Sequence, residues 1–457
     1  MPDTPHILAI NPWIHDFAAH DYWARPYGLL MLTAILREHG FRVSYIDCLD
    51  RFHPKSSMPS PHKRYGRGQY LKTHIPKPKG LEDVPRKYSR YGIKKEWFLE
   101  DLASIPIPDV ILVTSIMTYW AGGVRETIQI LKEQFPHVPV ILGGIYATLC
   151  FEHATQHSGA DRIIKGQGDR IILQLIQQET GYAVQPQFDP DQLDTYPYPA
   201  YDLQRTITFI PILTSRGCPY ACDYCASRYL VPKYQRHSPE YIYDEIMYWH
   251  NTYHITDFVF YDDALLIDAE TYIIPLLEKI IRNNHSLRFH TPNAVHVRAI
   301  TERLAKLMYQ AGFESIHLGL ESTTFSKDKR YDQKFVESEF QNALNALKSS
   351  GFHTDQIAAY LLAGLPDEDP YAIDDSINML LSIGVTPLLA NYTPIPHTAL
   401  WERAKAVSRY PLETDPVFTN NSIFPCQKEP FSWENLARYK RLMRNPIYSC
   451  QMEATKQ

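Results

Sequence analysis

Short apolar runs alternate with helical patterns along the first 180 residues. Five of these runs have the length of buried strands: His6–Ile10, Arg42–Asp47, Asp109–Thr114, Val138–Leu142 and Ala160–Ile164. Between them, leucines recur on one helical face before Gly40, and helical spacing returns over 124–135 and from about Asp169. Strands separated by helices pair in parallel, so the pattern predicts a doubly wound, Rossmann-like α/β domain over residues 1–180.

Two stretches interrupt this alternation. Residues 51–108 are long for a connection inside such a domain, which indicates an insertion with a function or a structure of its own. Residues 181–205 are rich in Pro and Tyr, which is typical of an extended linker between domains.

The strand–helix alternation resumes at Thr206 and continues to about residue 400. Candidate strands begin near residues 207, 257, 287, 314, 356 and 386, each followed by a helical pattern. The clearest helical face joins Val336, Phe340, Ala343, Leu344 and Leu347, and Gly351 ends it. An eight-unit barrel takes about 250 residues, so roughly 190 residues predict six units, a partial (β/α)6 TIM-like barrel over 206–400.

The remaining residues, 401–457, are predicted to form a helical extension that closes over the barrel. Its helical face is expected to hold Trp433, Leu436, Tyr439 and Leu442. Cys450 near the end is interpreted as a surface thiol rather than a participant in chemistry.

Composition narrows the class of protein. With 457 residues, 44% of them hydrophobic and 12% aromatic, the chain has room for more than one globular domain. No apolar run approaches the roughly 20 residues of a membrane span, and MPDTPHILAI lacks the basic start and apolar stretch of a secretory signal. We therefore expect a cytoplasmic protein with no membrane span, in which the seven cysteines stay reduced and available to metal.

The charge is unevenly distributed. Residues 51–95 hold thirteen Lys or Arg and two Asp or Glu, so the net charge of -5 is the balance of +11 here and -16 elsewhere. Such a patch attracts an anionic substrate, an acidic partner or nucleic acid, and a solvated loop that wraps its own domain explains it equally well.

Three cysteines carry the candidate chemistry. Cys218, Cys222 and Cys225 lie in SRGCPYACDYCASRY, directly after the first predicted barrel strand. Thiolates suit zinc or an iron–sulfur cluster, and three of them can hold three corners of a cubane while leaving one iron open. Structural zinc needs a fourth ligand, and nothing singles out His237 for that role. The spacing therefore favours a cluster.

CPYACDYC resembles the signature of the radical SAM superfamily, with Tyr224 as the aromatic residue before the last cysteine. The resemblance implies a 4Fe-4S cluster on the three cysteines, whose open iron binds the amino and carboxylate groups of S-adenosylmethionine (SAM). An electron donor such as flavodoxin or ferredoxin would reduce the cluster. Reductive cleavage of SAM would then give a 5′-deoxyadenosyl radical.

Later segments resemble further parts of that superfamily, in order and at barrel spacing. FYDDALLID offers Asp262 or Asp263 where the family often has Gly-Gly-Glu for the SAM amino group. HTPNAVHVRAIT resembles the third strand and turn of the cobalamin-associated branch. HLGLESTTF resembles the segment whose Glu-Ser contacts the SAM ribose and carboxylate, here Glu321 and Ser322.

YLLAGLPDED resembles the segment along the adenine, with Gly364 at its start and Asp367 in place of a second glycine. ANYTPIPHTALWE resembles the family's Pro-x-Pro-Gly-Thr segment, with His397 in place of glycine.

The first domain resembles the cobalamin-binding domain that precedes many radical SAM domains. RPYGLLMLTAILREHGF resembles its first helix and KGQGDR its last turn. The resemblance implies that Ser115 cradles the cobalamin tail and that Gly143 and Gly144 let it approach the backbone, although tight packing explains a glycine pair as well.

The Asp-x-His-x-x-Gly motif that supplies a cobalt ligand in some relatives is missing. His15 and His20 are therefore interpreted as ordinary histidines, and a fold relic that no longer binds cobalamin stays an alternative. Tyr22, Trp23, Tyr119 and Trp120 are candidates to line a substrate space, although aromatic residues are more often core.

The resulting hypothesis is a cobalamin-dependent radical SAM methyltransferase that acts on an unactivated carbon of a small-molecule or peptide substrate. A cyclase or rearrangement enzyme built from the same parts is the first alternative. A methylthiotransferase-like RNA modifier is the second, but its first domain would carry three further cysteines, and here only Cys48 and Cys150 are present. A nucleic-acid substrate is therefore not expected. A non-enzymatic carrier would leave the SAM-like motifs without a use.

Overall fold

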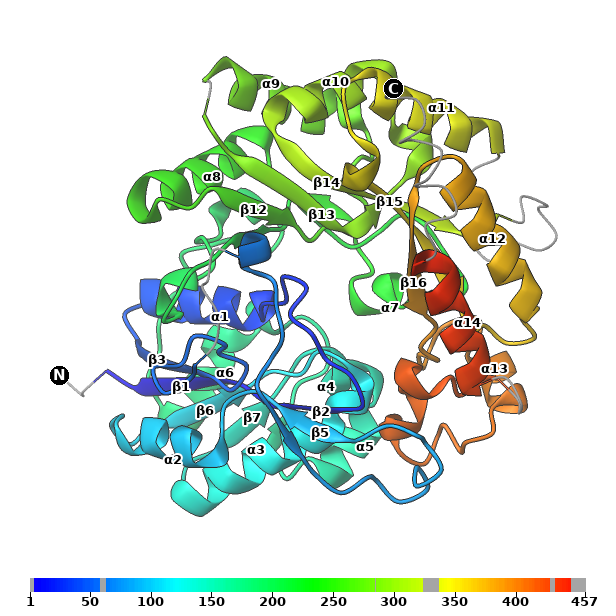
Figure 1. Cartoon of the computed structure of the whole chain (residues 1–457). Helices are drawn as coiled ribbons and strands as arrows, with labels where there is room; N and C mark the ends of the chain where they lie inside the picture. The colour runs from blue at the N-terminus through cyan, green and yellow to red at the C-terminus, as the bar shows by residue number, and fades with distance from the viewer. Residues whose placement is uncertain (1–3, 58–62, 284, 324–336, 428–431, 445–457) are drawn as a thin grey trace. The chain divides into compact units, whose positions relative to one another are not determined.

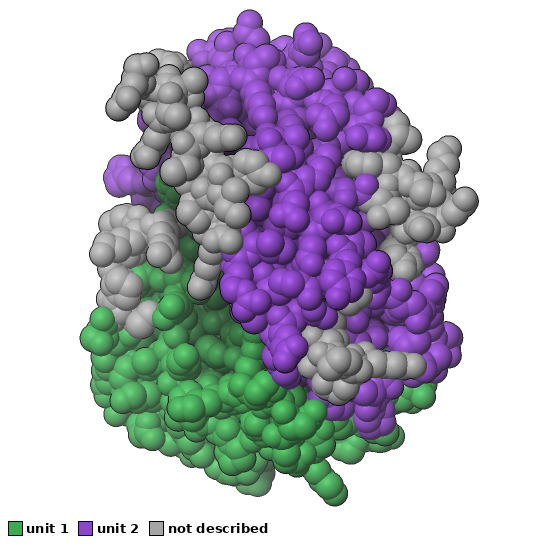
Figure 2. All heavy atoms as spheres, turned by 45° about the vertical axis from the view of Figure 1, so that its right-hand side comes forward, with its two compact units in different colours: residues 1–211, 229–237, 412–422 green, residues 212–228, 238–411, 423–457 purple. Residues whose placement is uncertain are grey.

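A computed structural model describes residues 4–57, 63–283, 285–323, 337–427 and 432–444, and Figure 1 traces its elements. The chain forms two compact units, coloured in Figure 2. Unit 1 comprises residues 1–211, 229–237 and 412–422, and unit 2 comprises residues 212–228, 238–411 and 423–457.

Unit 1 is built on a five-stranded parallel sheet in the order β3-β1-β6-β7-β8. Its strands are β1 (His6–Asn11), β3 (Arg42–Asp47), β6 (Val110–Val113), β7 (Val140–Leu142) and β8 (Arg162–Ile163). Its helices are α1 (Tyr27–Glu38), α2 (Lys95–Ala103), α3 (Ala121–Gln134), α4 (Ile145–Leu149), α5 (Phe151–His157) and α6 (Ile172–Thr180). The five predicted strands and the doubly wound class are confirmed.

Successive residues of β1 supply the cores on the two faces of this sheet. Ile7 and Ala9 pack into the core shared with α1 and α6, whereas Leu8 and Ile10 pack into the core shared with α2 and α3. This two-sided burial explains why the strand reads as a continuous apolar run, because a parallel sheet covered by helices leaves no polar face. Figure 1 shows the two helix layers around the sheet.

The predicted insertion contributes two strands, β4 and β5, to a small three-stranded sheet in the order β2-β5-β4. Its strands are β2 (Ile14–Asp16), β4 (Lys72–His74) and β5 (Ser89–Tyr91), and both pairings are antiparallel. β2 begins three residues after β1 ends, so this sheet starts at the carboxyl edge of the main sheet. Every residue of β4 is exposed.

Residues 181–205, predicted as a linker, are tied to unit 1. The His39 Nε2 atom accepts a hydrogen bond from the Gln187 amide at 2.9 Å, and the Arg37 guanidinium pairs with Asp202 at 2.7 Å. Residues 412–422 of the predicted C-terminal extension also belong to unit 1. Compact units are a different division from domains, so the domain boundaries stay a prediction.

Unit 2 contains a six-stranded sheet in sequential order, from β9 to β16. The strands are β9 (Ile210–Ile212), β12 (Asp257–Phe260), β13 (Arg288–Val295), β14 (Phe313–Glu321), β15 (Ile357–Ala363) and β16 (Thr386–Asn391). The helices between them are α8 (Pro239–Tyr253), α9 (Ile273–Arg282), α10 (Glu302–Ala311), α11 (Glu337–Ser349) and α12 (Pro370–Ser382). All six predicted strands are present, which confirms the partial-barrel pattern of β/α units.

The end of the chain is partly described. α13 (Trp401–Val407) and α14 (Ser432–Arg444) lie in unit 2, where α14 packs against α12. Leu436 and Tyr439 are buried as the helical pattern predicts, and the Arg438 guanidinium pairs with Asp374 at 2.8 Å. Val336 and Cys450 lie outside the described residues. No helix in the described part of the chain has both the length and the apolar composition to cross a bilayer.

The junction after β7 depends on Gly144. Its backbone has φ 95° and ψ −164°, a region that essentially only glycine occupies, and a Cβ there would lie 2.3 Å from the Ser115 carbonyl oxygen. A Cβ at Gly143 would meet no atom within 4 Å. Gly144 is therefore fixed by packing, whereas the space beside Gly143 is open.

We expect Gly144→Ala to lower the free energy of unfolding by at least about 2 kcal/mol, because the backbone must leave a glycine-only conformation and Ser115 must move. Gly143→Ala is the matched control and should change it by no more than about 0.5 kcal/mol. Urea unfolding of both variants tests this, and equal losses would contradict it.

Candidate functional site

The three candidate cluster cysteines lie on one loop that follows β9 and the short strand β10 (Ser215–Arg216). Cys218 and Cys222 are half-buried, Cys225 is exposed, and none of them forms a disulfide. The Cys225 amide donates to the Cys222 carbonyl at 3.1 Å, which folds the loop into a turn. All three thiols are thus held at the carboxyl end of the first barrel strand.

Ser227, which the sequence motif does not single out, contacts the last cysteine. It begins α7 (Ser227–Leu230), and its amide donates to the Cys225 sulfur at 3.5 Å while the two side chains lie 3.2 Å apart. Hydrogen bonds to cluster sulfurs tune the reduction potential of an iron–sulfur cluster.

Asp262 anchors the start of the cysteine loop. Its buried carboxylate accepts hydrogen bonds from the hydroxyls of Thr214 and Ser215, both at 2.6 Å, and from the Thr214 amide at 3.1 Å. Burial raises its pKa to about 6, and these three donors oppose that rise. The carboxylate follows β12 and its partners follow β9, so it joins two neighbouring strand ends.

Asp263 differs from its neighbour. Its side chain reaches the surface, but protein atoms displace much of the water around the carboxyl and so raise its pKa. A hydrogen bond with Ser227 opposes that rise. The sequence predicts that either Asp262 or Asp263 contacts the SAM amino group. Because the Asp262 carboxylate already accepts hydrogen bonds from Thr214 and Ser215, the geometry favours Asp263 for the contact with SAM.

Glu321 connects the cysteine loop to the fourth barrel strand. Its Oε1 atom accepts a hydrogen bond from the Tyr224 hydroxyl at 2.8 Å. The register between β14 and β15 shifts between Gly319 and Glu321, and Glu321 itself has φ 59°. A bulge of this kind re-aims a side chain at a strand end. Ser322 follows directly, with its amide bonded to the Leu320 carbonyl.

Gly364 is buried at the end of β15. It has φ 92°, and a Cβ there would lie 2.9 Å from the Phe424 ring. Its amide donates to the Glu368 carboxylate at 2.7 Å, and burial raises the pKa of Glu368 to about 8. Packing against Phe424 therefore already requires glycine here, and the predicted adenine contact stays a prediction.

Two residues that depart from the family's sequence pattern lie in the left-handed region of backbone conformation. Asp367 and His397 stand where the family has glycine, and their φ values are 58° and 69°. Asp and His tolerate this left-handed region better than most residues. The Asp367 carboxylate also pairs with Arg403 at 2.7 Å.

In unit 1, Ser115 shapes the carboxyl edge of the sheet. Its hydroxyl donates to the Gly143 carbonyl at 2.7 Å and accepts from the Ala147 amide at 3.3 Å. Its own carbonyl accepts from the Ile145 amide. Ser115 thereby fixes the turn that holds Gly143, and its contact with a cofactor stays a prediction.

The histidine and aromatic candidates of this edge divide by burial. His15 is buried and paired with Glu126 at 2.8 Å, while Trp23 and Tyr119 are core residues. Trp120 is half-buried and donates its indole N–H to the buried Asp16 carboxylate at 2.7 Å. Asp16 also accepts from the Asn420 amide at 2.8 Å, which ties the segment 412–422 into unit 1.

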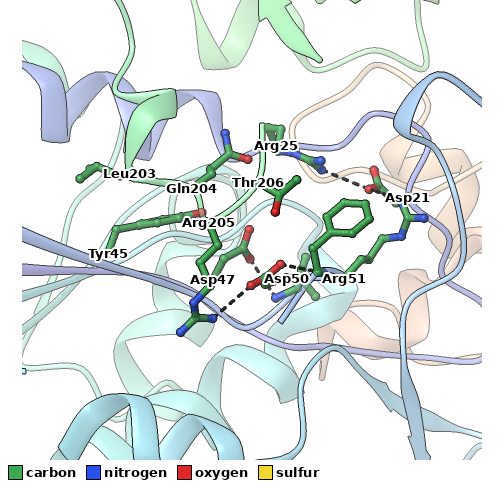
Figure 3. Close-up of a pocket in the computed structure, with 12 residues that line it drawn as sticks. Asp21, Arg25, Tyr45, Asp47, Asp50, Arg51, Leu203, Gln204, Arg205 and Thr206 are labelled. Carbon is green, nitrogen blue, oxygen red and sulfur yellow. Dashed lines mark hydrogen bonds and ion pairs between the residues drawn. The ribbon is translucent and has the colours of Figure 1, made fainter. Parts of the chain in front are cut away.

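A small pocket lined by charged residues lies at the carboxyl end of β3 (Figure 3). Arg25 and Arg51 each pair with Asp21 at 3.2 Å, and Arg205 pairs with Asp50 at 3.1 Å. The volume is about 40 Å³, enough for a few water molecules. Its charges satisfy one another, so it offers little to a cofactor.

The Asp47 carboxylate lines this pocket. Burial and the charge of Asp50 raise its pKa to about 6, against the opposing effects of Arg25 and of the donors Leu49 and Asn11.

Comparisons with known proteins identify both units. The family model "Radical SAM superfamily" matches residues 212–380, and the model "B12 binding domain" matches residues 93–176. The chain therefore carries a B12-binding domain followed by a radical SAM domain.

Among relatives of this radical SAM enzyme, an uncharacterized methyltransferase, PH0819 of Pyrococcus horikoshii, is 25% identical over 69% of this chain and 74% of its own. The anaerobic magnesium-protoporphyrin IX monomethyl ester cyclase of Rubrivivax gelatinosus is 23% identical over 65% of this chain and 58% of its own. The structure of the radical SAM methyltransferase TsrM of Kitasatospora setae, with tryptophan and a SAM analogue bound, covers 89% of this chain and 78% of its own, at 17% identity and a TM-score of 0.64.

The radical SAM match implies a 4Fe-4S cluster and SAM, and the B12-binding match supports cobalamin. Within the described residues, no group of three or more His, Cys, Asp or Glu is arranged to hold one metal ion. A cubane cluster does not require three ligands to converge on one ion, because each thiolate binds a different iron. The three loop thiols with the Ser227 donor fit that chemistry, and the open space at Gly143 fits the close approach of a large cofactor.

We expect Asp262→Ala to lower the iron content and the melting temperature, because three buried donors on the cysteine loop lose their acceptor, at about 1–3 kcal/mol for each unsatisfied group. Asp263→Ala should leave the iron content and the melting temperature unchanged and should weaken SAM binding. Iron analysis, thermal unfolding and SAM titration test the pair. Full iron content in Asp262→Ala would contradict the anchoring role.

Asp47→Asn should remove a pH dependence of stability. A carboxyl whose pKa is raised on folding favours the folded state below its unfolded pKa near 4, and this contribution is lost as the pH rises through about 6. From about pH 4.5 to about pH 7.5 the wild type should therefore lose about 2 kcal/mol relative to Asp47→Asn. Urea unfolding at both pH values measures the difference, and a constant difference would refute the assignment.

Proposed function

We propose that this radical SAM enzyme is a cobalamin-dependent methyltransferase that acts on an unactivated carbon. One observation carries the proposal. A single chain holds a cysteine loop at the carboxyl end of a parallel barrel strand and an open glycine turn at the carboxyl edge of a second parallel sheet. The named function of the Pyrococcus horikoshii relative supports it.

When bound, the reduced cluster supplies the electron that cleaves SAM, and cobalamin carries the methyl group. The residues of this chain hold and orient these groups. Cys218, Cys222 and Cys225 would bind the cluster, Asp262 fixes the loop that carries them, and Tyr224 with Glu321 fixes its far side.

Asp263, Glu321 and Ser322 would bind SAM, and Gly143 would face cobalamin. The exposure of Cys225 favours reduction by a protein donor such as flavodoxin or ferredoxin.

A cyclase that uses the same parts without methyl transfer is the second candidate. The Rubrivivax gelatinosus relative is named for such a reaction, and it spans a similar share of this chain. An RNA-modifying methylthiotransferase is less well supported, because Cys48 is fully buried and burial raises the pKa of its thiol well above its usual value. That environment disfavours a thiolate ligand for a second cluster.

The decisive experiment incubates the reduced holoenzyme with candidate acceptor substrates and with SAM labelled in its methyl group. We expect 5′-deoxyadenosine and labelled product, because methyl transfer moves the label and radical formation releases the nucleoside. Cys222→Ala, which removes one cluster ligand, is the control and should abolish both. Formation of 5′-deoxyadenosine with unlabelled product would reject methyl transfer and favour the cyclase.

A further inference from the structure

The small sheet of unit 1 borders a groove that the cofactor sites do not use. Two adjoining pockets of about 390 and 480 Å³ share Phe17, Ala18, Lys72 and Tyr91. Each volume lies in the range of small-molecule sites. Because β2 leaves the carboxyl edge of the main sheet, the groove begins beside the edge where the cofactor is expected.

One part of the groove is aromatic. Tyr22 is 65% exposed, and its ring lies 4.4 Å from the His20 ring at a tilt of 33°. Phe17, Tyr70 and Tyr91 are buried beneath the surface and form its floor. An exposed ring at the rim of an aromatic floor offers a stacking surface for a planar ligand.

The adjoining part is basic. Its lining includes Lys72, His74, Arg86 and Lys87, and no acidic residue lines either pocket. Within the described residues, neither Lys72 nor Lys87 makes an ion pair. Their ammonium groups are therefore available to an anion.

Burial lowers the pKa of Arg86 in the basic part of the groove, and the negative charge of Asp16 only partly opposes this. Asp16 is buried and accepts hydrogen bonds from Trp120, Asn420 and two backbone amides. Its charge is thus held by neutral donors inside the unit, and the surface of the groove stays positive.

We infer that this groove binds the nucleotide part of an anionic substrate, with the base against Tyr22 and the phosphate against Lys72 and Lys87. The ring and the phosphate of a nucleotide match the aromatic and basic parts, which adjoin at Lys72. The inference rests on the proposed function only in calling this ligand a substrate. It also gives a role in recognition to three of the thirteen basic residues of 51–95, which are Lys72, Arg86 and Lys87.

The test measures binding of uridine 5′-monophosphate to the full chain by calorimetry, with uridine, inorganic phosphate and a single-stranded RNA oligomer as separate titrants. A pyrimidine nucleotide avoids competition with the adenine of SAM. We expect the mononucleotide to bind more tightly than uridine or phosphate alone. The Lys72→Glu/Lys87→Glu variant should weaken it at least about tenfold, equivalent to about 1.4 kcal/mol.

Tyr22→Ala should weaken binding of the mononucleotide without changing the affinity for phosphate, because the substitution removes only the aromatic ring. Lys79→Glu/Lys306→Glu is the matched control, since both lysines are exposed, neither lines the groove, and the change in net charge is the same. It should leave affinity unchanged.

Absence of mononucleotide binding, or equal losses in the control, would overturn the inference. Binding of the RNA oligomer alone would overturn it in favour of a nucleic-acid surface. SAM cleavage is not needed for any of these readouts, so failure here is separate from failure of the proposed function.

Discussion

Parallel pairing is the constraint on which this structure depends. A parallel strand cannot be joined to its neighbour by a tight turn, so each connection crosses back through a helix and every strand ends at the same edge. In unit 2 this brings the loops after β9, β12, β14 and β15 to one edge although they are far apart in sequence. The cysteines, Asp262, Glu321 and Gly364 lie at the same edge of this sheet for this reason.

The loop that carries the cysteines has little regular structure, so its shape comes from side chains on other strands. Asp262 holds the loop before the first cysteine, and Glu321 holds Tyr224 just before the last. Burial raises the pKa of Asp262 to about 6, because a buried carboxylate loses the hydration of bulk water, and the hydrogen bonds that anchor the loop oppose that rise. The buried Asp262 carboxylate is therefore energetically unfavourable by itself, and the hydrogen bonds that order the loop offset this cost.

Much of this was predictable. Periodicity located all eleven strands of the two parallel sheets, because fully buried strands read as apolar runs, and the spacing of the cysteines predicted the family that comparison then confirmed. The three-residue strands of the insertion were not predicted, since so short a stretch has no measurable period.

Tertiary contacts account for the residue-level misses. Sequence could not separate Asp262 from Asp263, because only the fold decides which one turns inward. Ser227 lay outside the motif, and its contact with Cys225 arises from the start of a four-residue helix. Asp367 and His397 stand at two positions where the motif expects glycine, and both have the positive φ that glycine adopts most readily.

The chain passes between its two compact units five times. Asn420, near the end of the chain, donates to Asp16, near its beginning, so the first unit is completed only after the second is almost finished. No single cut yields either unit intact, and a fragment ending at residue 211 would leave a buried carboxylate short of a donor. A laboratory chimera that exchanges the N-terminal half for that of a relative would therefore also have to bring along residues 412–422.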